Sequence, residues 1–547
     1  MKHILRMIAR AGTRQTLFTD TPMRLFRGLL LVVALALPAS SCKDFLDVNT
    51  NPNGPSATTL SPYLYLPPME HWMVSSVLYD GRFIGRYTQM WNVCCSNPPS
   101  TWDRMGYDPS SDNGGEHWRD VYWSLGQNLV DMINKAEADQ RYDIAGVGYV
   151  MKAWGWMTLT DIHGDIIVKQ AFDQTRYYFD YDTQEYAYTE ALRLLDVAID
   201  NLKHTDGKVD AAYWRSGDRI YSGDRAKWLK LAYGFKAIAL NHFSNKSTYA
   251  PVKVMAYVDS SFASNADDAL LQYPATQPND DRNFWGPTRG NLPSYRQGAF
   301  AVSLVNGTVF NGTVDPRMSR MFAPSPDGLY RGYSVDATSA LTATQAPMNL
   351  WGYVTSPPAG SPTRYIFDDK TKMPLVTYAE LQFIKAEAAF RSGDKATALT
   401  AYKNGVAAHF DFVNARNSDN GQTPTQISAT EKATFLADVN VVPATASSLT
   451  MTHIMTQKYI ALWGWGFDEV WMDMRRFHYT DLDAATGKQV YPGFAFPTNL
   501  YPDNASKPAY RIRPRYNSEY VWNIATLTNL GAMAADFHTK PTWIINP

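Results

Sequence analysis

Cysteine is scarce in this chain, which has three cysteines among its 547 residues. A framework of disulfide bonds therefore cannot hold the fold together, and burial of apolar side chains must do so. Cys94 and Cys95 are adjacent in the sequence, and a bond between neighbouring cysteines is geometrically strained. We interpret the pair either as buried thiols or as an unusual vicinal disulfide formed in an oxidising compartment.

Net charge and long apolar runs are also lacking. The formal net charge is -1, whereas binding to nucleic acid calls for a clustered basic surface. The sequence has no glycine-rich phosphate loop and no Gly-x-Ser-x-Gly elbow, the motifs that would indicate nucleotide binding or a serine hydrolase. After residue 42, no apolar run approaches the length of a transmembrane helix.

One short apolar run, Leu29 to Leu37, lies near the start of the sequence. Arg24 and Arg27 precede it, and the small residues 39–41 follow it directly before Cys42. Basic residues, a short apolar core and small residues in this order are typical of a secretory signal. A cysteine directly after the small residues resembles the bacterial lipoprotein signal, in which the thiol carries a lipid.

This signal predicts where the chain is cut and anchored. We expect residues 1–41 to be removed, Cys42 to be lipidated, and residues 42–60 to form a tether at the membrane. Ala39 stands where lipoprotein signals prefer leucine, so an ordinary signal peptide that leaves Cys42 as an unpaired thiol is the alternative. Met23 directly precedes the basic residues and is a second candidate for the first residue of the protein.

Helical periodicity dominates the rest of the sequence. One helical face, with spacings of three and four residues, runs through Trp118, Tyr122, Leu125, Leu129, Met132 and Ala136. A second helix opens at Asp182, where an acid at the cap and Glu185 three residues later resemble a capping box. Further helices are expected over residues 142–158, 225–241, 377–390, 395–410 and 451–462. Strand-like alternation is sparse, so the sequence predicts a mainly α-helical fold.

One pair of helices has a more specific signature. Residues 378–391 lead into the turn 392–394, and Ala398, Tyr402 and Gly405 follow in the next helix. This small, aromatic, small spacing resembles the second helix of a tetratricopeptide unit, in which small residues admit the partner helix. We therefore expect tetratricopeptide-like helical pairs that form a scaffold, although no strict repeat period is present.

Long irregular tracts separate the helices. They cover residues 51–68, 97–115, 275–297, 315–362, 417–430 and 479–514. Tracts of this length in a compact protein are usually functional or mobile, and these are rich in Trp, Tyr, Asn, Asp and Arg. The sequence thus predicts long ligand-binding loops on a helical scaffold, in a single domain over residues 61–547.

Several short blocks occur in a recognisable order. They are Ser41 to Asn53, Leu159 to Ile166, Gly217 to Asp224, Lys227 to Lys230, Asp315 to Met318, Glu380 to Gly393, Gln457 to Leu462, Glu469 to Arg476 and Arg513 to Tyr520. In this order and spacing the sequence resembles the SusD/RagB family of nutrient-binding outer-membrane lipoproteins of Bacteroidetes. His163 and Ile167 depart from the family pattern, which usually has Tyr and Pro there.

The resemblance implies a cell-surface protein anchored by lipid to the outer membrane. Its tetratricopeptide-like scaffold would face a SusC-like TonB-dependent transporter, and its irregular segments would bind the ligand. Ligands in the family are mostly oligosaccharides, and one branch captures peptides. The resemblance implies neither catalysis nor a cofactor.

Aromatic residues supply the candidate ligand contacts. Trp, Tyr and Phe make up 13% of the chain. The apolar face of a sugar ring packs on Trp or Tyr, while polar side chains bond its hydroxyl groups. The loop residues that we expect to contact ligand are Trp91, Trp102, Tyr107, Trp285, Arg289, Tyr295, Arg296 and Trp351.

The sequence also leaves other functions open. Peptide binding on the same scaffold would rely on hydrogen-bonding grooves more than on stacking rings. A surface glycoside hydrolase would need paired carboxylates, for which Asp468, Glu469 and Asp473 are the candidates. Ion pairing with the nearby Arg475 and Arg476 is the alternative for these carboxylates. The spacing of Asp161, His163 and Asp165 matches no strong zinc pattern, so no metal is expected there.

Overall fold

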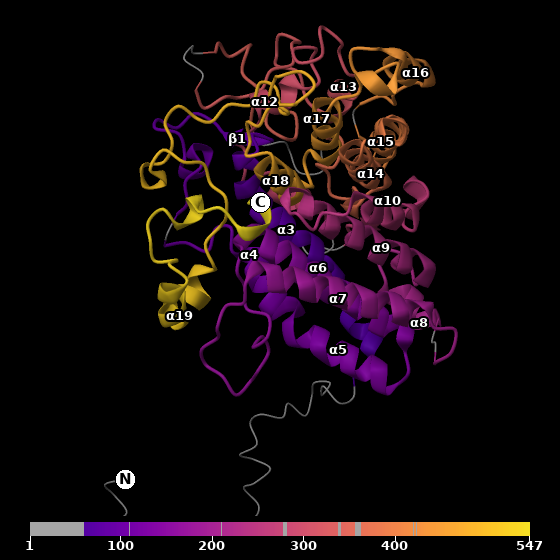
Figure 1. Ribbon diagram of the computed structural model, residues 1–547. Coiled ribbons are helices and arrows are strands. Elements are labelled where there is room, and N and C mark those ends of the chain that lie inside the picture. The colour runs from indigo at the N-terminus through magenta and orange to yellow at the C-terminus, as the bar shows by residue number, and fades with distance from the viewer. Residues whose placement is uncertain are drawn as a thin grey trace, which may run out of the picture. The chain divides into compact units, whose positions relative to one another are not determined.

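Helices make up most of the computed structural model (Figure 1). The structure describes residues 60–108, 110–208, 211–276, 282–336, 341–355, 363–419, 421–422 and 424–547. The expected signal peptide, Cys42 and all of the tether except Leu60 lie outside the described residues. Within the described part, no helix has both the length and the apolar character needed to cross a membrane. The fold class is mainly α, as the sequence predicts.

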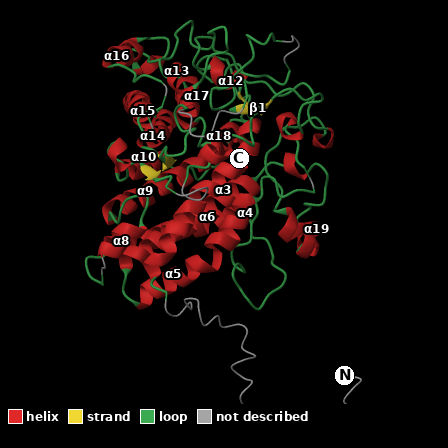
Figure 2. Cartoon of the chain, turned by 180° about the vertical axis from the view of Figure 1, so that it is seen from behind, coloured by secondary structure: helices red, strands yellow, loops and turns green. Residues whose placement is uncertain are grey.

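Ten longer helices form the body of the described part. They are α3 (Leu66–Tyr87), α5 (Gly126–Ala138), α6 (Tyr142–His163), α7 (Gln184–Lys203), α9 (Arg225–His242), α10 (Pro251–Asp259), α14 (Tyr378–Ser392), α15 (Lys395–Arg416), α17 (Met451–Leu462) and α18 (Phe467–Arg476). Contacts run from α5 to α6, α7, α9, α10, α14 and α15 in turn. Figures 1 and 2 show this row of helices on one side and irregular segments on the other.

The remaining helices have at most nine residues and lie mostly among the irregular segments. They are α4 (Glu116–Arg119), α8 (Ala211–Gly217), α11 (Trp285–Thr288), α12 (Ala299–Ser303), α13 (Met318–Met321), α16 (Ala429–Ala437) and α19 (Ile524–Asn529). Two short π-helical segments, η3 (Asp120–Leu125) and η8 (Tyr516–Tyr520), interrupt the chain near α4 and α19.

The pair α14 and α15 confirms the predicted helical pairing. Thr377 and Glu380 close a capping box at the start of α14, with side-chain to backbone distances of 3.2 and 3.3 Å. Gly393 ends the helix at a φ of 87°, a conformation that favours glycine. A Cβ atom on Gly405 would lie 2.9 Å from the ring of Phe383. The small residue therefore lets the two helices approach, as the sequence pattern implies.

Two pairs of short antiparallel strands join distant loops. β1 (Trp91–Val93) pairs with β3 (Tyr295–Gln297), and β2 (Ala269–Leu271) pairs with β4 (Met373–Val376). Just after β1, Cys94 and Cys95 are joined by a disulfide bond, and Cys95 is exposed. Of the two interpretations of this cysteine pair, the structure supports the vicinal disulfide and contradicts the buried thiols.

Two local details differ from the sequence expectation. The helical face over residues 116–136 is not one helix, because η3 separates α4 from α5 and Gly126 adopts a φ of 25°. The cap of α7 is Thr183 and not Asp182, since the Thr183 side chain accepts the N–H of Tyr186 at 3.3 Å. The carboxylate of Asp182 instead accepts the backbone N–H groups of residues 168 and 169.

Candidate functional site

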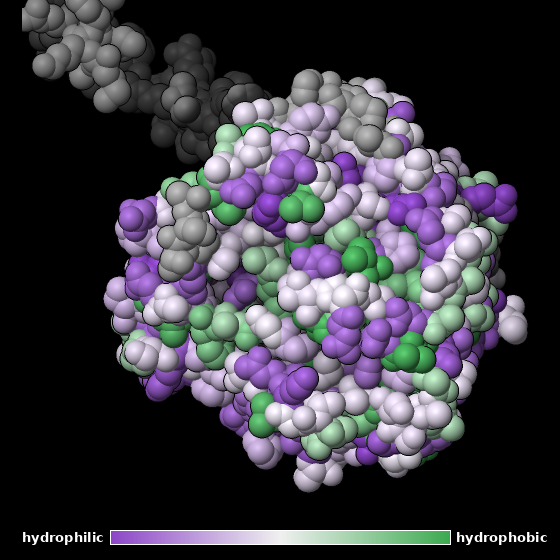
Figure 3. Space-filling model, turned by 90° about the horizontal axis from the view of Figure 1, so that it is seen from above, coloured by the Kyte–Doolittle hydropathy of each residue, from purple (hydrophilic) through white to green (hydrophobic). Residues whose placement is uncertain are grey.

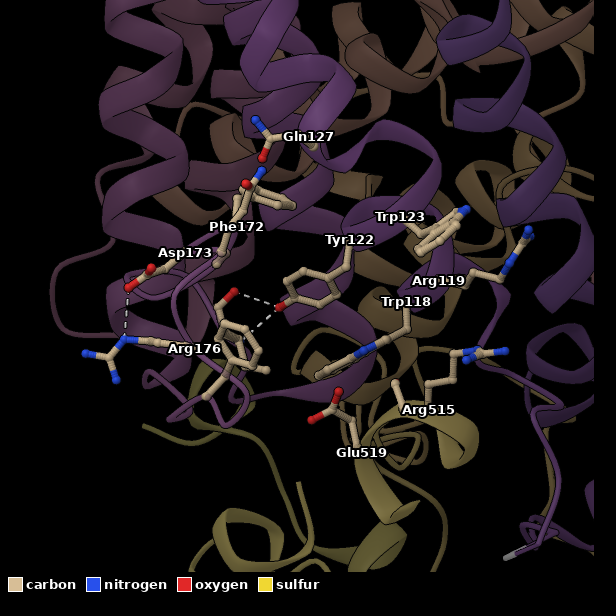
Figure 4. Close-up of a pocket in the computed structure, with 15 residues that line it drawn as sticks. Trp118, Arg119, Tyr122, Trp123, Gln127, Phe172, Asp173, Arg176, Arg515 and Glu519 are labelled. Atoms are coloured by element: carbon tan, nitrogen blue, oxygen red, sulfur yellow. Dashed lines mark hydrogen bonds and ion pairs between the residues drawn. The ribbon is translucent and has the colours of Figure 1, made fainter. Parts of the chain in front are cut away.

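A cavity of about 550 Å³ lies between three segments that are far apart in the sequence (Figure 4). The first segment is α4 with η3 and the start of α5, the second is the loop between α6 and α7, and the third surrounds η8 near the C-terminus. The lining residues are Trp118, Arg119, Tyr122, Trp123, Gln127, Ile167, Ala171, Phe172, Asp173, Gln174, Arg176, Phe179, Arg515, Ser518 and Glu519.

The π-helical segment η3 sets the direction of the rings in the first segment. Its extra residue per turn offsets the side chains from a regular helical face, and such segments often occur at functional sites. Tyr122 points across the cavity, where its hydroxyl donates to the carbonyl oxygen of Ile167 at 2.7 Å and accepts the Ile167 N–H at 2.9 Å (Figure 4). Trp123, the next residue, is 76% exposed while still lining the cavity.

The second segment is a loop closed at its base. Ile166 and Asp182 form an antiparallel bridge there. Higher in the loop, Gln170 and Asp180 exchange two hydrogen bonds, of 2.9 and 2.8 Å. These contacts hold the intervening residues, including Phe172, in a defined position over the cavity.

The third segment is tied to the loop by Asn523. Its side chain accepts the N–H of Phe179 at 3.3 Å and donates to the Phe179 carbonyl oxygen at 2.9 Å. Glu519 accepts hydrogen bonds from the hydroxyl of Tyr181, at 2.8 Å, and from Asn523, at 3.0 Å. A small apolar cluster of Leu527, Ala532 and Phe537, packed against Tyr181, Tyr520 and Leu530, supports this segment.

The cavity combines an aromatic wall with charged residues that are already paired. The rings of Trp118 and Tyr122 lie 5.0 Å apart, and those of Tyr122 and Phe172 lie 6.3 Å apart. Burial raises the pKa of Tyr122 well above its ordinary value, so its hydroxyl stays protonated. The lining arginines pair with carboxylates at the edges of the cavity: Arg119 with Glu116, Arg176 with Asp173, and Arg515 with Asp112. The lining arginines are therefore paired, whereas the Glu519 carboxylate is held by hydrogen bonds from two neutral groups.

Most of the ligand-contact residues expected from the sequence lie in the core instead. Trp91, Trp285 and Trp351 are at most 1% exposed. Their rings form one cluster, with 5.4 Å between Trp91 and Trp285 and 6.3 Å between Trp285 and Trp351. The indole of Trp351 donates to the carbonyl oxygen of Trp285 at 2.9 Å. To contact a sugar, these rings would have to leave the core.

The other expected residues are also engaged in packing or pairing. Trp102 and Tyr107 are buried with their rings 5.3 Å apart. Arg289 is buried in an ion pair with Asp369. Tyr295 lies buried in β3, and the half-buried Arg296 donates to the carbonyl oxygens of residues 293 and 354. As placed, the expected rings offer no free face to a sugar, and contact of these residues with ligand stays a prediction.

A second cavity, of about 310 Å³, lies near this group. Its polar lining includes Gln89, Asn92, Asp103, Ser303, Thr308, Ser334 and Asp336. Asp103 is held by Arg86 at 2.8 and 2.9 Å. The face seen in Figure 3, over α12 and α13, shows hydrophobic residues scattered among hydrophilic ones. This cavity could bond hydroxyl groups but lacks an exposed aromatic platform.

Two of the three carboxylates considered for hydrolysis, Glu469 and Asp473, belong to a buried network. Glu469 pairs with Lys458 at 2.6 Å and with His242 at 2.8 Å, while Asp473 pairs with Lys458 at 2.8 Å. Burial alone would raise the pKa of Glu469. The nearby positive charges of Lys458 and His242 lower it by more, so the pKa of Glu469 lies well below its ordinary value. Arg476 also contacts Asp473. These ion pairs join the helices that carry them, and Glu469 also lines a cavity of about 80 Å³.

Asp468 differs from its neighbours because its charge has no partner. Both of its carboxyl oxygens are buried without a hydrogen bond among the described residues, beside a cavity of about 80 Å³. Burial, with smaller contributions from Asp80 and Asp161, raises the pKa of Asp468 well above its ordinary value. The protonated carboxyl of Asp468 is compatible with the folded state, so the free energy of unfolding is highest below the unfolded pKa of this group. It falls as the pH rises through the folded pKa.

Replacing Asp468 with Asn should therefore stabilise the protein at alkaline pH. We expect Asp468→Asn to raise the free energy of unfolding by about 1–3 kcal/mol at pH 8, because a charged group without a partner is removed. Near pH 3 the variant and the parent should unfold alike, as Asp468 is then largely protonated in both states, its unfolded pKa being about 3.9. Urea unfolding at the two pH values measures this difference. Equal loss of stability by the variant at both pH values would contradict it.

Asp161, His163 and Asp165 lie at or just after the end of α6, where they bond neighbouring segments. His163 donates from Nδ1 to the carbonyl oxygen of Ile512 at 3.1 Å, and Asp165 accepts the N–H of Gln184 at 3.0 Å. In the described ranges, no group of three or more His, Cys, Asp or Glu side chains is arranged to hold a metal ion. The side chains of this triplet connect α6 to α7 and to the C-terminal segment.

Sequence reasoning did not identify the cavity. Trp118 and Tyr122 fall on the apolar face of a helical pattern and are therefore assigned to the core. Two signals could have indicated the site. Trp123 lies off that apolar face, and Tyr177 and Tyr178 form an aromatic pair within a polar loop.

The chain is similar in sequence and in fold to known proteins. A SusD-like family model, described as starch-binding associating with outer membrane, matches residues 57–500. A SusD/RagB family protein from Bacteroides thetaiotaomicron is 23% identical, with a TM-score of 0.68 over 89% of this chain and 99% of that one. A SusD homolog from Bacteroides fragilis is 20% identical, with a TM-score of 0.67 over 89% and 99% of the chains.

A third solved structure, a chitin-binding protein, is 20% identical, with a TM-score of 0.66 over 89% of this chain and 100% of that one. Among curated proteins, none matches the chain. The matches to solved structures show that this chain shares their fold over nearly its whole described length.

Proposed function

The chain belongs to the SusD-like family, described as starch-binding associating with outer membrane, and from that premise we propose that it captures an oligosaccharide at the cell surface. The aromatic cavity between α4, the α6–α7 loop and η8 is the proposed binding site. A SusC-like TonB-dependent transporter in the outer membrane is the proposed recipient of the sugar.

The observation that carries this proposal is the exposed ring of Trp123 at the edge of an aromatic wall. Trp118, Tyr122, Phe172 and Phe179 line the same cavity. A sugar ring packs its apolar face on such rings, while its hydroxyl groups bond polar side chains at the rim. The related chitin-binding protein supports a carbohydrate as the ligand.

Replacing Trp123 with Ala should weaken sugar binding about tenfold. Loss of one stacked ring costs on the order of 1.4 kcal/mol, which corresponds to that factor. Calorimetry with starch and chitin oligosaccharides measures the affinity of both proteins. Tyr213→Ala is the matched control, since Tyr213 is another exposed aromatic residue but stacks on Tyr63 at 4.6 Å and lines no part of this cavity.

The same calorimetry separates the competing functions. A panel of peptides, added under identical conditions, should give no heat if the ligand is a sugar. Binding to peptides alone would favour the peptide hypothesis and contradict the proposal. Release of shorter sugars from the bound oligosaccharide would instead indicate a hydrolase.

Replacing Cys42 with Ala should release the protein from membranes. Without its thiol the chain cannot receive the lipid, and each buried methylene of a lipid chain contributes about 0.8 kcal/mol to anchoring. Fractionation of cells that express the parent or Cys42→Ala measures the membrane-bound share. A variant that stays fully in the membrane fraction would contradict lipidation at Cys42.

The transporter partner can be tested with the lipidated chain. Affinity purification from detergent-extracted outer membranes should recover a TonB-dependent transporter in an amount comparable with the bait. Recovery of the bait alone, under conditions that keep outer-membrane complexes intact, would contradict the proposed partner.

A further inference from the structure

Exposed aromatic side chains gather around one site. In the part of the chain that the structure describes, the exposed aromatic residues are Trp123, Tyr177, Tyr178, Tyr213 and Trp522. All but Tyr213 belong to the three segments that build the aromatic cavity. Because exposed rings are costly in water, such a concentration marks an interaction surface.

These rings have no partner within the described chain. Trp123, Tyr177, Tyr178 and Trp522 are 76, 87, 67 and 71% exposed. None of them takes part in the ring contacts or side-chain hydrogen bonds found among the described residues, whereas the control residue Tyr213 stacks on Tyr63. Their faces are thus available to a ligand.

The rings extend beyond the cavity itself. Trp123 lines the cavity, but Tyr178 and Trp522 are not among the lining residues. Tyr178 precedes Phe179 and Trp522 precedes Asn523, and Asn523 holds the backbone of Phe179 by two hydrogen bonds, of 3.3 and 2.9 Å. Residues 178 and 522 therefore both lie at the junction between the loop and the C-terminal segment.

The surroundings of this junction favour a neutral, extended ligand. Arg176 pairs with Asp173, and the Glu519 carboxylate, which has no ion-pair partner among the described residues, accepts hydrogen bonds from two neutral groups. An acidic ligand would be repelled by this carboxylate. A cavity of about 550 Å³ is in the size range that takes one small ligand. A short sugar in it would leave Tyr178 and Trp522 unused.

We propose that the ligand is a linear, neutral oligosaccharide that fills the cavity beside Trp123 and continues across the junction onto Tyr178 and Trp522. This inference rests on the proposed function and specifies its substrate class, a chain longer than the cavity holds. The cavity forms one subsite, and the rings at the junction form the next.

A length series tests the inference. Affinities are measured by calorimetry for maltooligosaccharides and chitooligosaccharides from the disaccharide to the octasaccharide. For the class that binds, affinity should rise with length beyond the disaccharide. Trp522→Ala and Tyr178→Ala should each weaken the octasaccharide about three- to tenfold and leave the disaccharide unchanged. Trp123→Ala should weaken both.

The controls separate this inference from the proposed function. Tyr213→Ala should change neither affinity, and unchanged melting temperatures should show that the exposed-residue variants remain folded. If sugars bind with an affinity independent of length, or if Trp522→Ala and Tyr178→Ala leave the octasaccharide unaffected, the inference is overturned while the proposed function stands. If no sugar of any length binds, the proposed function fails and the inference fails with it.

Discussion

Replacing Glu387 with Gln is expected to lower the free energy of unfolding by about 3–5 kcal/mol, the range found when one partner of a buried ion pair is removed. Glu387 is fully buried on α14. It accepts two hydrogen bonds from Arg476 at 2.7 and 2.9 Å, one from Asn241 at 2.8 Å and one from Arg391 at 2.8 Å. One carboxylate thus joins α9, α14 and α18.

The pH dependence of this effect follows from the same contacts. Burial alone would raise the pKa of Glu387. The positive charges of Arg476 and Arg391 lower it by more, so the pKa of Glu387 lies well below its ordinary value. A group with a lowered folded pKa contributes stability above its unfolded pKa, about 4.3, and loses that contribution as the pH falls through the folded pKa. The difference between the parent and Glu387→Gln should therefore be largest near neutral pH and shrink in acid.

Denaturant unfolding at pH 7 measures the effect, and an exposed pair provides the control. Glu190 and Arg193 form an ion pair at 2.7 Å on the surface of α7, so Glu190→Gln should change stability by no more than about 0.5 kcal/mol. A loss below about 1 kcal/mol for Glu387→Gln would show that the buried network does not hold the helices together.

Replacing Gly298 with Ala is expected to destabilise the protein by about 3 kcal/mol, near the upper end of the usual cost of overpacking. A Cβ atom on Gly298 would lie 1.9 Å from the carbonyl oxygen of Gln89 and 2.9 Å from its carbonyl carbon. The two backbones cannot simply move apart, because Gly298 donates its N–H to Met90 at 2.9 Å and the adjacent β3 pairs with β1.

Gly290→Ala is the matched control for this substitution. Gly290 is exposed, and a Cβ atom there would meet nothing within 4 Å. Alanine at such a site should leave stability unchanged or raise it by about 0.4–1 kcal/mol. Thermal unfolding of both variants gives the comparison, and equal melting temperatures for the two would contradict the close approach of Gly298 to the backbone of Gln89.

The parts of the fold that sequence predicts well are those determined locally. The periodicity predicts a helix over residues 451–462, and α17 has these bounds. Its start is marked by the cap at Thr450, just as Thr377 marks the start of α14. Helical spacing acts over a few residues, so a single sequence reveals it. The one cap that we predicted, at Asp182, lies one residue from the observed cap of α7, Thr183.

Helix α3 shows what local signals miss. Gly81 and Gly85 lower its helix propensity, and the sequence does not predict it. In the fold these glycines admit neighbours, since a Cβ atom would lie 2.1 Å from the Phe467 ring at Gly81 and 2.4 Å from the Trp91 ring at Gly85. Packing against side chains outside the helix, one of them distant in sequence, therefore stabilises α3.

The same limit explains the candidate site. Whether a ring is buried or exposed depends on segments distant in sequence, so Trp91 and Trp285, both in predicted loops, pack in the core. Trp123 lies next to the predicted core residue Tyr122 and is exposed, and both residues line the cavity. The number of aromatic residues suggests stacking on sugars, but only the fold selects which rings are free.

The most direct test of the central claim is photo-crosslinking with a diazirine derivative of the oligosaccharide that binds in calorimetry. Cross-linked peptides are identified by mass spectrometry. If the sugar occupies the aromatic cavity, cross-links should fall in residues 116–127, 167–183 and 515–524. Cross-links confined to residues 89–103, 299–309 and 493–497, around the polar cavity, would contradict the account.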